Sequence, residues 1–244
     1  MIMNYDLTSF KKGLLELNIE LSDKQFEMFV LYYEKLIEWN SFMNLTAITE
    51  WEDVVTKHFI DSLSIVKSSD FMTDASYTLL DVGTGAGFPG IPLKIAFPSL
   101  KVILLDSLNK RINFLNEVID TLGLTGIECF HGRAEEYAHK KDFRQSFDYV
   151  VSRAVANMTV LSEFCVPFVK VNGCFISYKS DKAKSELDEA SYALEVLGCE
   201  VSGVIEFLLP GSDLSRSVIS VKKIKDTPSR YPRKAGLPSK EPLK

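Results

Sequence analysis

Residues 78–92 read Thr-Leu-Leu-Asp-Val-Gly-Thr-Gly-Ala-Gly-Phe-Pro-Gly-Ile-Pro. The apolar run from Leu79 to Val82 predicts a short buried strand. Four glycines follow within eight residues, and glycine permits tight turns, positive φ angles and close approach of the backbone to a ligand. Pro92 suits the first turn of a helix, where its missing N–H is no loss. A strand, a glycine loop and a helix in this order are typical of a nucleotide-type pocket at the carboxyl end of a parallel sheet.

The glycine spacing narrows the class of ligand. A dinucleotide fingerprint fails because Phe88 stands at its sixth position, and a Walker A loop fails because Ile91 replaces the lysine. The remaining pattern, Asp81-Val-Gly-x-Gly-x-Gly, resembles the first motif of class I S-adenosylmethionine-dependent methyltransferases. Asp106 ends the next predicted strand, 23 positions after Gly83, close to the roughly 20-residue spacing at which a carboxylate binds a ribose. An ordinary glycine-rich turn with a solvated aspartate is the alternative.

From Thr78 onward, strand and helix patterns alternate. Seven strands are predicted, at 79–82, 101–105, 127–131, 147–152, 173–178, 201–208 and 217–223, with helices at 109–122, 159–169 and 182–197. The last two strands have no helix between them, which favours an antiparallel hairpin at a sheet edge. The alternation predicts an α/β fold, a Rossmann-like sheet that is mostly parallel and covered by helices on both faces.

The chain divides into three parts. Residues 1–75 show only helical periodicity, including a capping box at 22–25 and a helix from about Glu52 to Leu63, so we expect a helical N-terminal lobe. Residues 76–224 form the predicted sheet domain. Residues 225–244 hold four prolines and predict an extended or loop-like tail. Nothing in the sequence indicates an obligate dimer, so we expect a monomer.

Composition points to the cytoplasm and to an anionic partner. No apolar run reaches the roughly 20 residues of a membrane span, and the N-terminus lacks the pattern of a signal peptide. The four cysteines are scattered, as in a protein of a reducing compartment. Residues 222–244 carry eight basic and two acidic side chains, whereas the rest carries 20 basic and 31 acidic. A basic tail on an acidic body suggests local contact with an anion, although a solvated tail that aids solubility is the alternative.

Ligand-facing residues of such a sheet lie at the carboxyl ends of its strands. Ala134 and Glu135 follow the third strand, where a backbone N–H and a carboxylate suit an adenine ring. Arg153 ends the fourth strand, beside the expected methyl group or substrate; a salt-bridged structural arginine is its alternative. The predicted cofactor-binding residues are therefore Asp81, Gly83, Gly85, Gly87, Phe88, Asp106, Ala134, Glu135 and Arg153.

Together these motifs resemble one family over nearly the whole chain. Seven segments are similar to the RsmG family, also called glucose-inhibited division protein B. They are the glycine loop with its Phe-Pro-Gly extension, Asp106-Ser-Leu-Asn-Lys-Arg, Gly132-Arg-Ala-Glu, Ser152-Arg-Ala-Val-Ala, Asn44-Leu-Thr, His58-Phe-Ile-Asp-Ser-Leu and the tail Arg230-Tyr-Pro-Arg-Lys-Ala-Gly-Leu-Pro. The resemblance implies S-adenosylmethionine as the methyl donor and a single guanine N7 in the decoding-region loop of 16S ribosomal RNA as the acceptor. One position departs from the family pattern, because Ser180 stands where a glycine is expected.

The absence of two catalytic motifs from the sequence agrees with methylation at guanine N7. Guanine N7 carries a free lone pair and no proton, so its methylation needs positioning rather than an activated nucleophile on the protein. No Asn-Pro-Pro-Tyr motif follows the fourth strand, and no Pro-Cys or Thr-Cys pair marks the nucleophile of a carbon methyltransferase. Arg153 is the candidate that orients the base. His58 is expected to cap the cofactor pocket, to contact RNA or simply to pack between helices, and the three histidines do not cluster as zinc ligands would.

Basic and aromatic residues are the candidates for contact with RNA: Lys110, Arg111, Lys179, Arg230, Tyr231, Arg233, Lys234 and Lys240, with Tyr231 available to stack on a base. Rival functions remain. A small molecule or a protein is an alternative acceptor, and a ribosome-assembly factor with a vestigial pocket is the non-enzymatic alternative. A dehydrogenase is disfavoured by Phe88.

Overall fold

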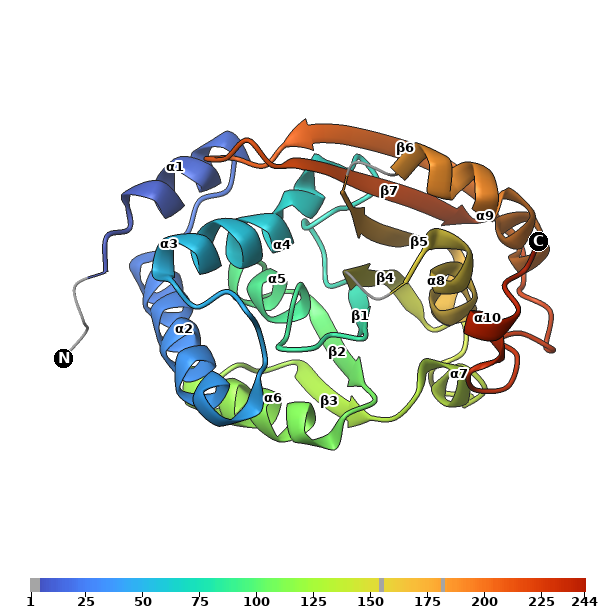
Figure 1. The fold of residues 1–244 in the computed structure, drawn as a ribbon, viewed down its shortest axis with the longest axis horizontal. Helices are drawn as coiled ribbons and strands as arrows, with labels where there is room; N and C mark the ends of the chain where they lie inside the picture. Colours follow the sequence, from blue (N-terminus) through green and yellow to red (C-terminus); the bar gives the residue numbers. More distant parts are fainter. Residues whose placement is uncertain (1–4, 154–155, 181–182) are drawn as a thin grey trace.

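A computed structural model of the chain describes residues 5–153, 156–180 and 183–244. Seven strands form one sheet in the order β3-β2-β1-β4-β5-β7-β6 (Figure 1). The strands are β1 (Thr78–Val82), β2 (Lys101–Asp106), β3 (Ile127–His131), β4 (Phe147–Arg153), β5 (Val169–Lys179), β6 (Cys199–Leu208) and β7 (Ser215–Lys223). Strands β1 to β5 pair in parallel, whereas β7 is antiparallel to both β5 and β6. The predicted mostly parallel sheet with a C-terminal hairpin is confirmed.

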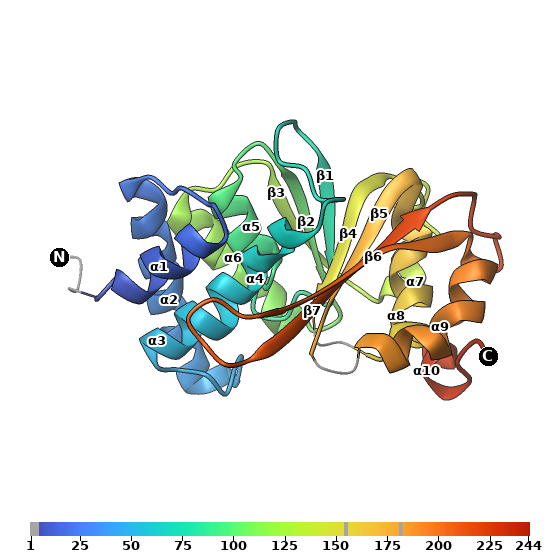
Figure 2. The ribbon, with the colours of Figure 1, turned by 90° about the horizontal axis from the view of Figure 1, so that it is seen from above.

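Helices cover both faces of this sheet, as Figure 2 shows from above. One face carries α1 (Thr8–Glu16), α2 (Asp23–Met43), α3 (Trp51–Val54), η1 (Val55–Ile60), α4 (Asp61–Leu63), η2 (Ser64–Lys67), α5 (Gly90–Ala96) and α6 (Asn109–Leu122). The other carries α7 (Ala134–Tyr137), α8 (Met158–Cys165), η3 (Val166–Phe168), α9 (Ala183–Leu197) and α10 (Leu237–Lys240). None of the helices described has the length and apolar character that crossing a membrane requires.

Alternate residues of each central strand point to opposite cores. In β1, Leu79 lies in the core beneath the N-terminal helices, and Leu80 lies in the core beneath α8 and α9. The N-terminal helices therefore share one hydrophobic core with the sheet. The β6–β7 hairpin extends over the same helices (Figure 2), where Ser202 donates a hydrogen bond to Asp70 and Lys67 lies over the Phe207 ring.

The helix predicted from about Glu52 to Leu63 is present, but its hydrogen-bonding pattern changes along its length. It runs from Trp51 to Leu63, and its middle part, η1, is a π-helix. Helix α2 before it is preceded by the N-cap residue Ser22, which forms the predicted capping box with Gln25. Short π-helical turns widen the backbone spiral and are frequent at functional sites. This turn holds His58, and Arg153 donates to the carbonyl of Lys57 within it.

Two predicted boundaries at β5 were wrong. We expected a helix from Thr159 to Val169, but α8 ends at Cys165 and a 3-10 turn contains Pro167. Proline removes an N–H donor and clashes with the preceding turn, which ends the α-helix there. Val169 is then free to pair with Phe147 of β4, so β5 starts four residues before the predicted strand. Lys182, the expected first residue of the next helix, lies outside the described residues.

The C-terminal tail folds back onto α7 and α8 instead of extending (Figure 1). Arg144 donates hydrogen bonds to the carbonyls of Thr227, Pro228 and Tyr231. Arg233 makes a bidentate contact with Glu163 of α8, with Nη2 2.7 Å from Oε2. Such bidentate pairs are stronger than hydrogen bonds between neutral groups, because carboxylate and guanidinium match in shape and carry opposite charges. The tail is thus fixed to the domain by its own backbone and one buried ion pair.

Candidate active site

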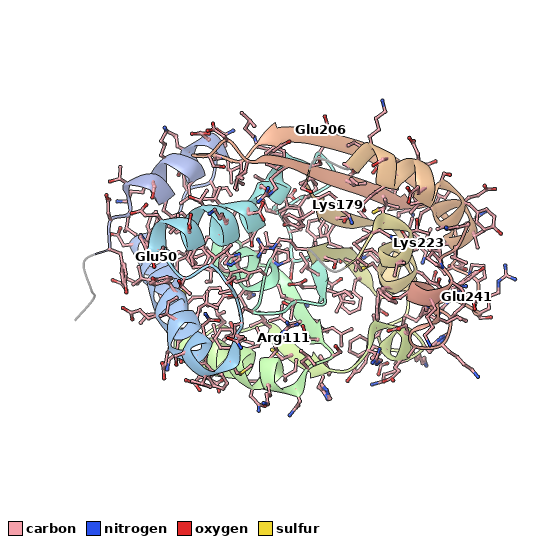
Figure 3. All side chains as sticks on the ribbon, viewed as in Figure 1. Glu50, Arg111, Lys179, Glu206, Lys223 and Glu241 are labelled. Atoms are coloured by element: carbon pink, nitrogen blue, oxygen red, sulfur yellow. The ribbon has the colours of Figure 1, made fainter. Side chains whose placement is uncertain are left out.

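A cavity of about 950 Å³ opens where the strands end. It is lined by residues that follow four neighbouring parallel strands: Gly83, Gly85 and Phe88 after β1, Asp106 and Arg111 after β2, Arg153 at the end of β4, and Lys179 at the end of β5. Figure 3 labels Arg111 and Lys179. The wall is completed by Thr46 from the loop after α2, by His58 and Asp61 from η1 and α4, and by Arg216 from β7. The predicted loop, Asp106 and Arg153 are therefore brought together.

The glycine loop presents an open surface to the cavity. Gly85 has a φ of +62°, and a Cβ there would meet no atom within 4 Å. A side chain at Gly85 would therefore project into the cavity. Gly87, with a φ of +96°, lies on the opposite side, since a Cβ there would be 2.7 Å from the Tyr32 hydroxyl. Of the predicted contacts, Gly85 faces the cavity and Gly87 faces the protein.

Asp81 lies behind the loop and is fully buried. Its Oδ2 accepts hydrogen bonds from the Thr84 hydroxyl at 2.7 Å and from the Gly90 N–H at 2.9 Å. Burial raises the pKa of Asp81 to about 7. Asp81 was predicted among the cofactor contacts, but the structure places it beneath the loop, where it joins the two ends of the turn.

Asp106 is held from three sides. Its Oδ2 accepts from the Gly85 N–H at 2.9 Å and from Arg111 Nη1 at 3.2 Å, and its Oδ1 accepts from the Leu108 N–H at 2.9 Å. A carboxylate offers about four lone-pair directions, so one acceptor position remains. The side chain is only 2% exposed. This geometry ties the second strand to the glycine loop and leaves an acceptor at the cavity.

Three side chains stack on the far side of the loop. The His58 ring lies 4.5 Å from that of Phe88 at an interplanar angle of 19°. The Arg153 guanidinium is 5.1 Å from the centre of the same Phe88 ring. A cation within about 6 Å of an aromatic ring is attracted to it. Phe88, a predicted cofactor contact, therefore links the loop to His58 and Arg153.

Asp61 connects three distant segments of the chain. It is 5% exposed, and it accepts from Arg153 Nη1 at 2.7 Å and from Arg216 Nε at 2.8 Å. Burial of a charge is costly unless the charge is paired. The two guanidinium groups supply the opposite charge for the buried Asp61 carboxylate. Arg153 is thus both salt-bridged and part of the cavity wall. Its interpretation as a structural arginine and its interpretation as a residue of the site are therefore compatible.

Sequence reasoning assigned no role to Thr46, Asp61 or Arg216. Asp61 follows His58 by one helical turn and belongs to the same His58-Phe-Ile-Asp-Ser-Leu motif, and these were the signals that could have placed it near the site. Arg216 is the second residue of β7, and nothing in its sequence neighbourhood distinguishes it from a surface arginine. Only the sheet order β5-β7-β6 brings it to the cavity.

His58 is neutral in this environment. Burial and the neighbouring charge of Arg153 lower the pKa of His58 to about 3. Its Nδ1 lies 3.1 Å from Arg153 Nη2, and its Nε2 lies 2.9 Å from Thr46 Oγ1. A second positive charge beside Arg153 is thereby avoided.

We expect the free energy of unfolding to fall as the pH is lowered, because His58 takes up a proton more readily in the unfolded chain. The unfolded chain protonates it near pH 6.5, whereas the folded chain does so only near pH 3, so protons favour unfolding between these values. Compared with His58→Asn, the wild-type protein should lose roughly 1 kcal/mol more unfolding free energy between pH 6 and pH 5. Urea unfolding at the two pH values measures this difference. Equal pH slopes for the two proteins would contradict a neutral buried His58.

Ala134 and Glu135 do not line the cavity. They begin α7, and the Glu135 carboxylate accepts from the backbone N–H of Gly236 at 3.0 Å. The tail therefore occupies one oxygen of the carboxylate that was expected to meet an adenine amino group. In the described structure these two residues lie apart from the loop, Asp106 and Arg153.

The residues predicted to contact RNA fall into four groups. Arg111 and Lys179 line the cavity, where Lys179 pairs with Glu186 at 2.7 Å. The exposed side chains are Lys110, Arg230, Lys234 and Lys240. Arg233 is engaged by Glu163. Tyr231 was expected to stack on a base, but it is only 6% exposed and packs in the core beneath α8 and α9, so that prediction is corrected.

The described residues include no group of three or more His, Cys, Asp or Glu that is placed to hold a metal ion. All four cysteines are free thiols, and burial raises the pKa of Cys129, Cys174 and Cys199 to about 12. At that pKa the thiolate nucleophile is scarce. These thiols are therefore packing groups in this fold.

Comparisons with known proteins show the family of this chain. Residues 25–215 match the model of the family described as rRNA small subunit methyltransferase G, or GidB. The chain is 58% identical over 238 residues to the ribosomal RNA small subunit methyltransferase G of Lachnoclostridium phytofermentans, covering 98% of both chains. It is 50% identical over 234 residues to that of Alkaliphilus metalliredigens, covering 96% of this chain and 97% of the relative.

Two solved structures share the fold at low sequence identity. The YcgJ protein from Bacillus subtilis has a TM-score of 0.50 at 14% identity, over 68% of this chain and 98% of that chain. TrmN from Thermus thermophilus has a TM-score of 0.51 at 14% identity, over 70% of this chain and 53% of that chain. These likenesses concern the fold alone. The family model and the full-length relatives show that this chain belongs to the rRNA small subunit methyltransferase G family.

Proposed function

We propose that this protein transfers a methyl group from S-adenosylmethionine to N7 of one guanine in the decoding-region loop of 16S ribosomal RNA. The observation that carries the proposal is the single cavity in which an open glycine loop faces the Arg153–His58–Asp61 cluster. Membership of the family supports ribosomal RNA as the acceptor. Such a substrate implies the small subunit, or an intermediate of its assembly, as the partner and the cytoplasm as the site of action.

The residues around the loop fit the cofactor. The space above Gly85 would be filled by any side chain, and a cavity of about 950 Å³ has the size of a small-molecule pocket. Asp106 keeps one acceptor position for a ribose hydroxyl, and Phe88 supplies an apolar edge. Gly83, Gly85, Phe88 and Asp106 are therefore the residues that we assign to S-adenosylmethionine, whose sulfonium supplies the methyl group.

The task left to the protein is positioning. Guanine N7 already has its lone pair, so no proton must be removed before attack. Accordingly, the carboxylate of Asp61 is paired with two arginines, and His58 is a neutral hydrogen-bonded ring. Arg153 directs its described donor contacts to Lys57, Asp61 and His58. We propose that it acts by holding these groups in place at the rim of the methyl-transfer site.

Exposed lysines and arginines would bind the RNA backbone. Lys110 lies beside the cavity at the start of α6, and Arg230 and Lys234 lie on the folded tail. Phosphate contacts of this kind supply affinity and make it depend on salt. We propose these three as phosphate contacts, with Arg111 and Lys179 closer to the target base.

Methyl transfer to defined acceptors tests this function. Purified protein is incubated with labelled S-adenosylmethionine and small ribosomal subunits that lack the N7 methyl group, and label in RNA is counted. We expect about one methyl group per subunit and none in ribosomal proteins. Label in protein or in small molecules, with the RNA unlabelled, would contradict the proposal and favour another acceptor.

A further inference from the structure

A chain of hydrogen bonds runs along one wall of the cavity, from Arg153 through His58 to Thr46. Arg153 Nη2 lies 3.1 Å from His58 Nδ1, and His58 Nε2 lies 2.9 Å from Thr46 Oγ1. Thr46 lines the cavity beside His58. Its backbone N–H donates to Asn40 Oδ1 at 2.9 Å, which fixes the residue against the end of α2.

The direction of each bond in this chain is determined by Arg153. A guanidinium group only donates, so His58 Nδ1 must accept. The ring is neutral, with a pKa lowered to about 3, and its one proton is therefore on Nε2. That N–H donates to Thr46 Oγ1. The opposite tautomer would place an N–H against the guanidinium and is excluded by the same rule.

Thr46 Oγ1 receives a second hydrogen bond, from the backbone N–H of Ile48 at 3.0 Å. A hydroxyl has two acceptor sites and one donor, and both acceptor sites are now filled. Its proton has no acceptor among the residues that the structure describes. The hydroxyl is thus fixed as a donor, at the edge of a cavity where a ligand is expected.

We propose that the Thr46 hydroxyl donates to O6 of the target guanine, an assignment that rests on the function proposed above. On the outer edge of guanine, O6 and N7 are adjacent acceptors, whereas adenine presents an amino donor in place of O6. A fixed donor therefore accepts guanine and opposes adenine. It also sets the position of N7, because O6 and N7 belong to one rigid ring. Thr46 is then a specificity-determining residue, and Arg153 and His58 are positioning residues that act through it.

Two substitutions distinguish the hydroxyl from the methyl group of Thr46. Thr46→Val keeps the shape and removes the hydroxyl, both as the donor and as the acceptor for His58 and Ile48, whereas Thr46→Ser keeps the hydroxyl. We expect Thr46→Val to lower kcat/KM for small subunits by about 10- to 100-fold, with Thr46→Ser close to wild type. Affinity for S-adenosylmethionine, measured by calorimetry, should be unchanged in both. Thermal unfolding of the two variants verifies that both are folded.

A substrate analogue separates recognition from structure. Small subunits reconstituted with 2-aminopurine at the target position keep N7 and lack O6. On this RNA the wild-type protein should already be slow, and Thr46→Val should cause no further loss. An equal loss by Thr46→Val on both RNAs, or no loss on guanine, would overturn the proposal. Weaker binding of S-adenosylmethionine by Thr46→Val would also overturn it, because the donor would then face the cofactor. If the wild-type protein methylates no RNA, the proposed function itself fails.

Discussion

Gly85→Asp should abolish binding of S-adenosylmethionine. The new side chain would enter the cavity, because a Cβ at Gly85 meets no protein atom within 4 Å. Its carboxylate would also lie near Asp106, which accepts from the N–H of the same residue. Loss of space and repulsion of like charge act together, so we expect affinity to fall by roughly 100-fold or more. Isothermal titration calorimetry measures the change directly.

The control is Gly123→Asp. Gly123 also has a left-handed backbone, with a φ of +60°, and a Cβ there also meets nothing within 4 Å. It is the C-cap of α6 and lies outside the cavity lining. The two variants share the added charge and the backbone strain, so only their position differs. Wild-type affinity in Gly85→Asp, or equal losses in both variants, would contradict the assignment of the loop.

Arg233→Gln should destabilise the protein, whereas Lys234→Gln should not. Arg233 pairs with Glu163, whose side chain is only 1% exposed, so the substitution leaves a buried carboxylate without its partner charge. We expect a loss of roughly 3 kcal/mol of unfolding free energy. That corresponds to a fall of about 9 °C in Tm for a chain of this size. The exposed Lys234 should change stability by less than about 0.5 kcal/mol.

For RNA binding the two variants should rank in the opposite order, with Lys234→Gln having the larger effect. If Lys234 contacts a phosphate, Lys234→Gln reduces the slope of log K against log salt by about 0.7 to 0.9. Arg233→Gln, measured below its melting range, should leave that slope unchanged because the side chain is engaged by Glu163. Both variants remove one positive charge, so net charge cannot explain a difference. Equal salt slopes together with equal Tm values would mean that Arg233 is a surface charge like its neighbour.

Much of the fold could be predicted because its signals are local. The run from Leu79 to Val82 is apolar and is followed at once by glycines, so strand and loop are encoded side by side. Asp106 is found by its spacing from the loop. The end of α8 was missed because the apolar pattern continues through Pro167 into β5, and the proline decides the boundary.

The partners of Arg153 in the cavity wall could not be predicted in the same way, although Arg153 itself was predicted from its place at the end of the fourth strand. Asp61, Arg153 and Arg216 come from three elements, and their charges compensate one another only after the sheet has formed. The docking of the tail was missed for a related reason. Its positive charge suggested an anionic partner, but one such partner is the buried Glu163 of the same chain. Long-range ion pairs of this kind leave no periodic pattern in the sequence.

The most direct measurement is the position of the methyl group on the RNA. Small subunits are methylated by the purified protein, and the RNA is then treated to break the strand at N7-methylguanine. We predict one cleavage site, at a guanine of the decoding-region loop, that appears only with both enzyme and S-adenosylmethionine. Label that enters the RNA without any strand break at guanine would contradict N7 as the acceptor atom.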